Sequence, residues 1–202
     1  MTLHVARHGQ TDWNLEPARC QGWADVELNE TGRAQARARG LALVDRRIEL
    51  IVTSHLVRAR ETAEIVREEL VSAAGHDIPL VVDPRLAETH RGEWEARLFS
   101  EIMHEEPVTW RAYREHPDTF RFPSGESLGD QQRRVLAAVR DAALDGRTAL
   151  LVTHGGSIRL LRCFLTGKGL GAFHAMTTHN GTVDDVMVEG LTERIGAFLD
   201  GG

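Results

Sequence analysis

Short runs of apolar residues alternate along this chain with longer stretches in which apolar positions recur every three to four residues. Uninterrupted apolar runs are typical of buried strands, whereas the longer periodic stretches are typical of amphipathic helices. Because the two kinds of stretch alternate, we predict a three-layer α/β/α fold with a largely parallel sheet and helices on both faces. The pattern leaves the order of the strands open. The predicted strands are residues 3–6, 49–54, 78–82, 148–152 and 182–188.

Polar residues that can cap a helix mark where several helices begin. Asn29 is a suitable N-cap for a helix that ends near residue 44, and Ser127 and Asp130 form a capping box for another. Between residues 85 and 125 the pattern is less regular, because three prolines interrupt it. The predicted helices are residues 29–44, 57–71, 127–144 and 157–165, with shorter helices at about 98–105 and 108–115.

The organisation of the chain is that of a single unit. No repeat, low-complexity tract or linker divides its 202 residues. We therefore expect one domain, residues 1–202, with a cap-like insertion at about 91–123. The formal net charge of −6 argues against nucleic acid as a partner.

Cysteine usage and hydropathy indicate the compartment. Cys20 and Cys163 lack the spacing of a metal site or a redox motif, so we expect free thiols in a reducing environment. The first residues belong to the predicted strand rather than to a signal peptide, and no apolar run is long enough to span a bilayer. We therefore expect a cytoplasmic protein without a membrane partner.

Two predicted strands end in the same pair of residues. The first strand leads into Arg7, His8 and Gly9, and the strand at 148–152 leads into His154 and Gly155 after one threonine. In an open α/β sheet, ligands bind beyond the carboxyl ends of the strands, so both histidines are expected in one pocket. Two imidazoles and a guanidinium around one point suit a phosphoryl group.

Each of these residues has a distinct use in phosphoryl transfer. His8, held as a neutral imidazole, would be the nucleophile, and Arg7 would clamp the phosphoryl oxygens. His154 would be a second donor, while Gly155 would offer a closely approached backbone N–H. The helix that starts near Gly156 would point its positive end at the same place.

Two further strand ends contribute charged side chains. Arg58 falls in the first turn of the helix that follows the strand at 49–54, which places it at the same edge of the sheet as His8. Glu88 follows the strand at 78–82 and is the natural acid for the leaving oxygen. Beside an anionic phosphate a carboxyl group favours its protonated form, which an acid requires.

At this point the chain resembles the histidine phosphatase superfamily, also called the phosphoglycerate mutase-like family. Four motifs carry the resemblance over nearly the whole chain, each at a strand end. They are R-H-G-x-T at 7–11, S-x-L-x-R-A-x-x-T-A at 54–63, L-x-E-x-x-x-G-x-W-E at 86–95 and T-H-G-G-x-I-R at 153–159.

The resemblance implies the phosphoglycerate mutase-like fold and a phosphohistidine intermediate on His8. Glu88 would protonate the leaving alcohol and then help to activate water. No metal and no organic cofactor are implied. The remaining implied pocket residues are Arg7, Arg58 and His154 around the phosphate, with Asn14, Gln21, Gly22 and Gly155 along the wall.

The same family contains hydrolases and mutases, and two motifs favour a phosphatase. Residues 19–25 (RCQGWAD) resemble the small phosphatases, and the run after Glu88 (THRG) differs from that of the mutases. Residues 7–14 are close to the mutase version, and Ala96 stands where the family usually has glycine, which bears on the shape of that loop. We expect a phosphomonoesterase acting on a small phosphorylated metabolite.

Other functions stay open on this evidence. The first is a cofactor-dependent phosphoglycerate mutase, the second a non-catalytic module that binds a phospho-ligand, and a third a protein phosphohistidine phosphatase. The retained His8, His154 and Glu88 argue against the non-catalytic module. The resemblance permits a monomer or a homodimer. Substrate choice is expected to rest on the segment between residues 91 and 122, whose arginines are Arg91, Arg97, Arg111, Arg114 and Arg121.

Overall fold

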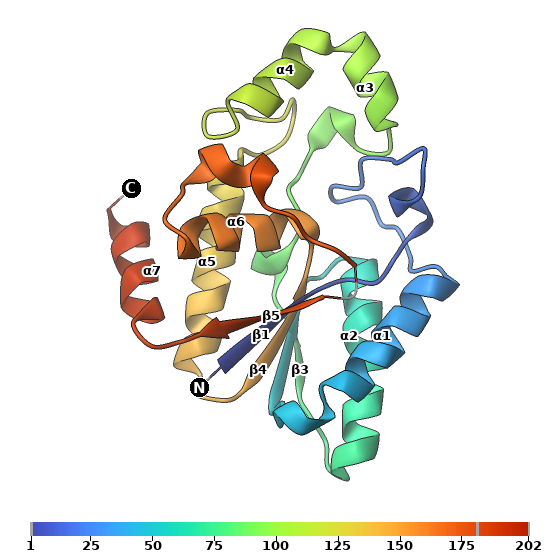
Figure 1. The fold of residues 1–202 in the computed structure, drawn as a ribbon, viewed down its shortest axis with the longest axis vertical. Coiled ribbons are helices and arrows are strands. Elements are labelled where there is room, and N and C mark those ends of the chain that lie inside the picture. Colours follow the sequence, from blue (N-terminus) through green and yellow to red (C-terminus); the bar gives the residue numbers. More distant parts are fainter. Residues whose placement is uncertain (1, 181, 202) are drawn as a thin grey trace.

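The computed structural model describes residues 2–180 and 182–201, which form a central five-stranded sheet between layers of helices (Figure 1). The strand order is β3-β2-β4-β1-β5. Strands β1 to β4 run parallel, whereas β5 runs antiparallel to β1 at one edge. The prediction of a largely parallel sheet is therefore confirmed. The strands are β1 (Thr2–Arg7), β2 (Leu50–Thr53), β3 (Leu80–Val82), β4 (Ala149–Thr153) and β5 (Val183–Met187).

Helices cover both faces of this sheet (Figure 1). The helices α5, α6 and α7 pack on one face, and α2 packs on the other with α1 beside it. Side chains alternate between the two faces along each strand. In β4, Leu151 lies in the first core, whereas Leu150 and Val152 lie in the second. These helices are α1 (Glu30–Ala42), α2 (Val57–Ala74), α5 (Leu128–Leu144), α6 (Gly155–Leu165) and α7 (Leu191–Asp200).

Above the carboxyl ends of the strands lies the cap, which we define as residues 91–123 (Figure 1). It contains α3 (Phe99–Glu105) and α4 (Pro107–Glu115), at the two places where short helices were predicted. Its buried side chains form a third hydrophobic cluster around Trp94, together with Leu160, Cys163 and Phe173 from the body of the protein. Edge-on aromatic contacts of Trp94 with Tyr113 and Phe122 order this cluster.

Several elements differ from the sequence prediction. Helix α7 was not predicted, and α6 begins at Gly155, two residues before the predicted start. Five short 3₁₀ helices were also missed, at Asp12–Asn14, Val44–Arg46, Pro84–Leu86, Gly92–Trp94 and Leu170–Ala175. Among the helices of the described residues, none combines the length and apolarity needed to cross a bilayer.

Candidate active site

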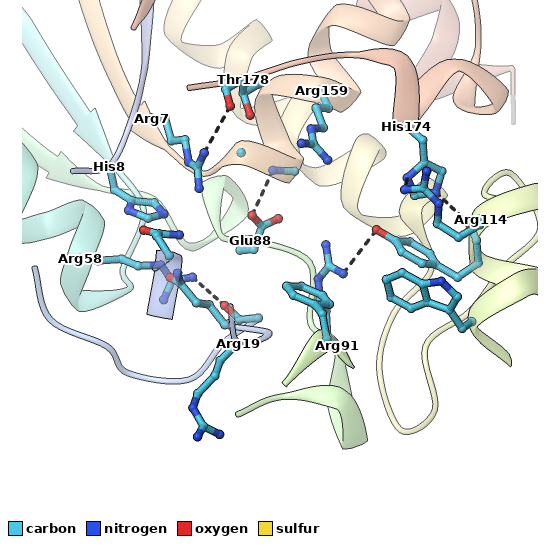
Figure 2. A pocket seen from close by; sticks show the side chains of 18 residues that line it. Arg7, His8, Arg19, Arg58, Glu88, Arg91, Arg114, Arg159, His174 and Thr178 are labelled. Atoms are coloured by element: carbon cyan, nitrogen blue, oxygen red, sulfur yellow. Dashed lines mark hydrogen bonds between the residues drawn. The ribbon is translucent and has the colours of Figure 1, made fainter. Parts of the chain in front are cut away.

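A cavity of about 300 Å³ opens at the carboxyl edge of the sheet, between the strand ends and the cap (Figure 2). Its wall is strongly cationic, because six of the residues that line it are arginines. The residues that line it are Arg7, His8, Asn14, Arg19, Gln21, Gly22, Arg58, Glu88, Arg91, Phe99, Trp110, Tyr113, Arg114, Gly155, Gly156, Arg159, His174 and Thr178.

His8 stands directly after β1, and its ring is held in one orientation. Its Nδ1 lies 2.7 Å from the carbonyl oxygen of Gly9. Because a carbonyl oxygen only accepts hydrogen bonds, Nδ1 carries the proton and Nε2 keeps a free lone pair. The backbone amide of His8 donates to the carbonyl of Thr153 at 2.9 Å, which ties this residue to the end of β4. His8 is therefore arranged as a nucleophile.

Gly9 permits the tight turn that follows His8. A Cβ atom at this position would lie 2.4 Å from the carbonyl oxygen of Gly32, near the start of α1. The amide of Gly9 also donates to the hydroxyl of Thr62 on α2 at 3.0 Å. Helices α1 and α2 thus fix the loop that carries His8.

The surroundings of His8 favour its neutral form. Burial lowers the pKa of the imidazole well below 6.5, and the nearby charges of Arg58, His154 and Arg7 lower it further. The hydrogen bond to Gly9 acts in the opposite direction but is the weakest of these effects. The imidazole of His8 is therefore uncharged at neutral pH, as nucleophilic attack by Nε2 requires.

Arg7 and Arg58 carry the positive charge beside His8, and neither forms an ion pair with a carboxylate in the described residues. Arg58 is fully buried and donates to the carbonyls of Gly22, at 2.7 Å, and Ala24, at 2.9 Å. Burial lowers its pKa to about 10, which still leaves it a cation at neutral pH. In the part of the chain that the structure describes, the Nε atom of each arginine has no hydrogen-bond partner, which leaves a donor for an oxyanion.

Glu88 comes from the loop after β3 and lines the same cavity as Arg7 and Arg58. Its carboxylate accepts hydrogen bonds from the amides of Thr89, at 2.9 Å, and Gly156, at 3.0 Å. Arg134 on α5 donates to the backbone carbonyls of Ala87 and Glu88, at 2.7 Å each, which holds the loop in place.

The protein groups around Glu88 favour its ionised form, and the expected protonation beside a phosphate stays a prediction. Burial raises the pKa of the carboxyl group, but the charge of Arg91 and the amides of Gly156 and Thr89 outweigh burial and lower it to about 2. The cations therefore keep the group ionised. A phosphate that pairs with the same cations would weaken this effect and raise the pKa again.

His154 lies beside His8, with their ring centroids 5.2 Å apart, but it is not among the residues that line the cavity. It is fully buried, and its Nε2 lies 2.8 Å from the hydroxyl of Ser54. Burial, followed by the charge of Arg58, lowers its pKa well below 6.5. Its predicted role as a donor to phosphate stays a prediction.

The residues predicted along the wall of the pocket also line the cavity. Asn14 accepts from the amide of Thr11 at 3.0 Å, and Gln21 donates to the hydroxyl of the same threonine at 3.0 Å. Gly22 has a φ of +48°, and a Cβ there would collide with Glu95. Gly155 lines the cavity as predicted, although the amide that reaches Glu88 is that of Gly156.

Of the five cap arginines, Arg91 and Arg114 reach the cavity (Figure 2). Arg97 pairs instead with Glu105 and Glu106, Arg121 pairs with Asp130, and Arg111 is exposed away from the wall.

Other wall residues were missed. Arg159 follows Gly155 by one helical turn on α6, and this spacing was a usable signal. No sequence signal marked His174 or Thr178, which come from the segment after α6. Trp94 is in the cap core and not in the wall, whereas Trp110 lines the cavity. In the described part of the chain, no three His, Cys, Asp or Glu side chains are grouped to hold a metal ion.

Comparison with known proteins places this geometry in a family. Residues 3–198 match the histidine phosphatase superfamily (branch 1). A 2,3-bisphosphoglycerate-dependent phosphoglycerate mutase from Cytophaga hutchinsonii is 33% identical over 172 residues, which cover 81% of this chain and 76% of that protein. An uncharacterized phosphatase from Bacillus subtilis is 34% identical over 165 residues, which cover 81% of this chain and 76% of that protein.

Among solved structures, a mycobacterial glucosyl-3-phosphoglycerate phosphatase in complex with VO₃ is 33% identical and superimposes with a TM-score of 0.79. The match covers 92% of this chain and 90% of that chain. The family match over almost the whole length agrees with the four strand-end motifs and with the cationic cavity around His8. This chain belongs to the histidine phosphatase superfamily, branch 1.

Proposed function

We propose that the protein is a phosphomonoesterase that works through a phosphohistidine on His8. The observation that carries the proposal is the ring of His8, whose Nδ1–H is committed to Gly9 while Nε2 remains free in a cavity lined by arginines. The phosphatases among its relatives also support it.

The first half-reaction transfers the phosphoryl group to the protein. His8 Nε2 attacks phosphorus, the bond between phosphorus and the ester oxygen breaks, and Arg7 and Arg58 pair with the non-bridging oxygens. The leaving oxygen takes a proton from Glu88, whose carboxyl group is protonated once the phosphate neutralises the cations around it. The products of this step are an alcohol and phosphohistidine.

The second half-reaction returns the protein to its starting state. Glu88, now a carboxylate, accepts a proton from a water molecule as the water oxygen attacks phosphorus. The bond between phosphorus and Nε2 breaks, inorganic phosphate leaves, and His8 is again a neutral imidazole. Charge on the phosphoryl oxygens is balanced by arginines throughout.

The residues on the side of the cavity away from His8 support a narrower substrate class, namely a phosphomonoester with a second anionic group. Arg91, Arg114 and Arg159 lie there, and none forms an ion pair with a carboxylate in the described residues (Figure 2). Arg91 donates to the hydroxyl of Tyr113 at 3.4 Å, and Arg114 lies 3.1 Å from Nδ1 of His174. These cations are available to a carboxylate or a second phosphate on the substrate.

A matched pair of substrates tests both parts of the proposal. We would measure phosphate release from 3-phosphoglycerate and from glycerol 3-phosphate, which differ mainly in the carboxylate, with wild type and His8→Ala. Release that disappears in His8→Ala supports the phosphatase. A clear preference for 3-phosphoglycerate that is lost in Arg159→Gln, but kept in Arg121→Gln, supports the second anionic group.

Other outcomes point to the alternatives. Interconversion of 3- and 2-phosphoglycerate that depends on added 2,3-bisphosphoglycerate would replace the hydrolase with a mutase, the activity that several relatives carry. Binding of the esters without release or transfer would support a non-catalytic phospho-ligand module. Equal rates for the two esters would be consistent with a phosphatase. They would contradict the proposed preference for a substrate with a second anionic group.

A further inference from the structure

A network of buried polar side chains adjoins Glu88. Its members are Gln131 on α5, Ser157 on α6 and Thr89 in the loop after β3, and all three are fully buried. None of them lines the cavity around His8, whereas Glu88 does (Figure 2). Buried polar groups need hydrogen-bond partners, so the contacts within the network determine how each side chain is oriented.

The side-chain nitrogen of Gln131 is surrounded by acceptors. It lies 3.3 Å from Oε1 of Glu88 and 3.3 Å from the backbone carbonyl oxygen of Ala87. It also lies 3.1 Å from Oγ of Ser157, whose hydroxyl donates to the same carbonyl at 3.1 Å. On its other side, Oε1 of Gln131 accepts a hydrogen bond from the hydroxyl of Thr89.

These partners permit only one orientation of the Gln131 amide. If the amide were reversed, its oxygen would face the carboxylate of Glu88 and the carbonyl of Ala87, neither of which can donate. A buried contact between acceptors is unfavourable, so the nitrogen faces Glu88. The carboxylate of Glu88 therefore receives a hydrogen bond from α5 in addition to the one from the start of α6.

The two oxygens of Glu88 are consequently in different states. Oε1 accepts from the amide of Thr89 at 2.9 Å and from Gln131, and these two donors fill its lone pairs. The hydroxyl of Thr89 lies 3.3 Å from the same oxygen, but its single hydrogen is directed at Gln131, the closer acceptor. Oε2 has one donor among the described residues, the amide of Gly156, and keeps a lone pair for a proton.

We propose that Gln131 is the positioning residue of the general acid: it holds Oε1 of Glu88 as an acceptor, so that Oε2 carries the transferable proton. The inference rests on the proposed function, in which Glu88 protonates the leaving alcohol. In that step the Oε2–H bond breaks and its electron pair stays on the carboxylate, while the leaving oxygen takes the proton as its bond to phosphorus breaks. Because Gln131 donates to the carboxylate, it also favours the ionised form that this step produces.

The single-turnover rate of phosphoryl transfer, with the protein in excess and measured against pH, tests this inference. In Gln131→Met we expect transfer from 3-phosphoglycerate to slow by about tenfold, and the alkaline limb of its pH profile to move up by about one unit, because Glu88 loses a donor and holds its proton more tightly. Transfer from p-nitrophenyl phosphate should stay within about twofold of wild type, because its phenolate leaves without a proton.

The matched control is Gln132→Met, which removes the neighbouring buried amide of α5. Gln132 donates to the carbonyl of Leu160 at 3.0 Å, so its loss should leave both rates and the alkaline limb at their wild-type values. An alkaline limb in Gln131→Met that coincides with that of wild type overturns the inference. Equal slowing of the two esters also overturns it, since a purely structural role would affect both.

A second variant covers the case in which Gln131→Met does not fold. Thr89→Val is similar in shape and removes the hydroxyl that orients the amide of Gln131, so it should move the alkaline limb in the same direction. An unmoved limb in folded Thr89→Val then overturns the inference. Absence of phosphoryl transfer in wild type is a different result, because it would contradict the proposed function and this inference with it.

Discussion

The backbone amide of Gly156 donates a hydrogen bond to Oε2 of Glu88 at 3.0 Å, and the two residues pack so closely that position 156 has no room for a side chain. A Cβ atom there would lie 2.0 Å from Oε1 of Glu88. The start of α6 and the candidate acid therefore hold each other in place.

We predict that Gly156→Ala lowers kcat/KM for an alkyl phosphate by about 10²-fold or more, because the added methyl group displaces the acid. The comparison is Gly196→Ala in α7, where a Cβ meets no atom within 4 Å and activity should be unchanged. Equal activity of the two variants would mean that the position of Glu88 is unimportant for catalysis.

Replacement of Glu88 by glutamine should slow the hydrolysis of each ester. The loss of rate should be larger for an ester whose leaving group needs a proton. We expect a loss of about 10²–10⁴-fold for alkyl phosphates and a much smaller loss for p-nitrophenyl phosphate, whose phenolate leaves without help. The two rate ratios are measured in parallel at pH 7. A similar loss for both esters would argue against general acid catalysis by Glu88.

The buried histidines predict a loss of stability in mild acid. Burial and neighbouring cations hold the pKa of His8 and of His154 well below 6.5 in the folded protein. Below about pH 6.5 the unfolded chain therefore binds protons that the folded protein does not, and stability falls as the pH falls. The expected slope is about 1.4 kcal/mol per pH unit for each such histidine, between pH 6.5 and its folded pKa.

Denaturant unfolding between pH 7 and pH 5 measures that slope. His8→Asn removes one of the two groups, so its free energy of unfolding should fall less steeply with pH than that of wild type. His76→Asn, which replaces an exposed histidine, serves as the comparison. A His8→Asn protein with the wild-type slope would contradict the assignment of a neutral, buried imidazole.

Ala96 is predicted to be a source of strain. Its φ is +67°, in the left-handed region that L-residues other than glycine seldom adopt. We expect Ala96→Gly to raise the free energy of unfolding by up to about 1 kcal/mol, since relief of strain exceeds the extra flexibility of the unfolded chain. Thermal unfolding would show an increase in Tm, and a decrease would mean that neighbouring contacts favour the alanine.

The residues around His8 could be predicted because parallel strands bring their carboxyl ends to one edge of the sheet. That rule places Arg7, Arg58 and Glu88 together in the absence of any knowledge of strand order. The same rule places His154 beside His8, and their ring centroids are 5.2 Å apart. A strand end does not specify the hydrogen-bond partner of the ring, which is the hydroxyl of Ser54.

The cap residues could not be predicted in the same way. Arg97 and Arg114 are both arginines of the irregular segment, yet one pairs with Glu106 and the other faces the cavity. Their difference depends on how α3 and α4 are rotated, which the tertiary packing around Trp94 decides. Helix α7 was missed for another reason, because its short apolar pattern follows directly after the edge strand.

The shared aromatic core has a consequence for protein engineering. Trp94 and Tyr113 of the cap pack in one cluster with Leu160 and Phe173 of the body, so the cap is not a hinged lid that can be exchanged as a module. A chimera that receives α3 and α4 from a relative would also need the matching face of α6 and the segment after it. To change the substrate preference, point substitutions in the cavity wall are therefore a better route than transplantation of whole helices.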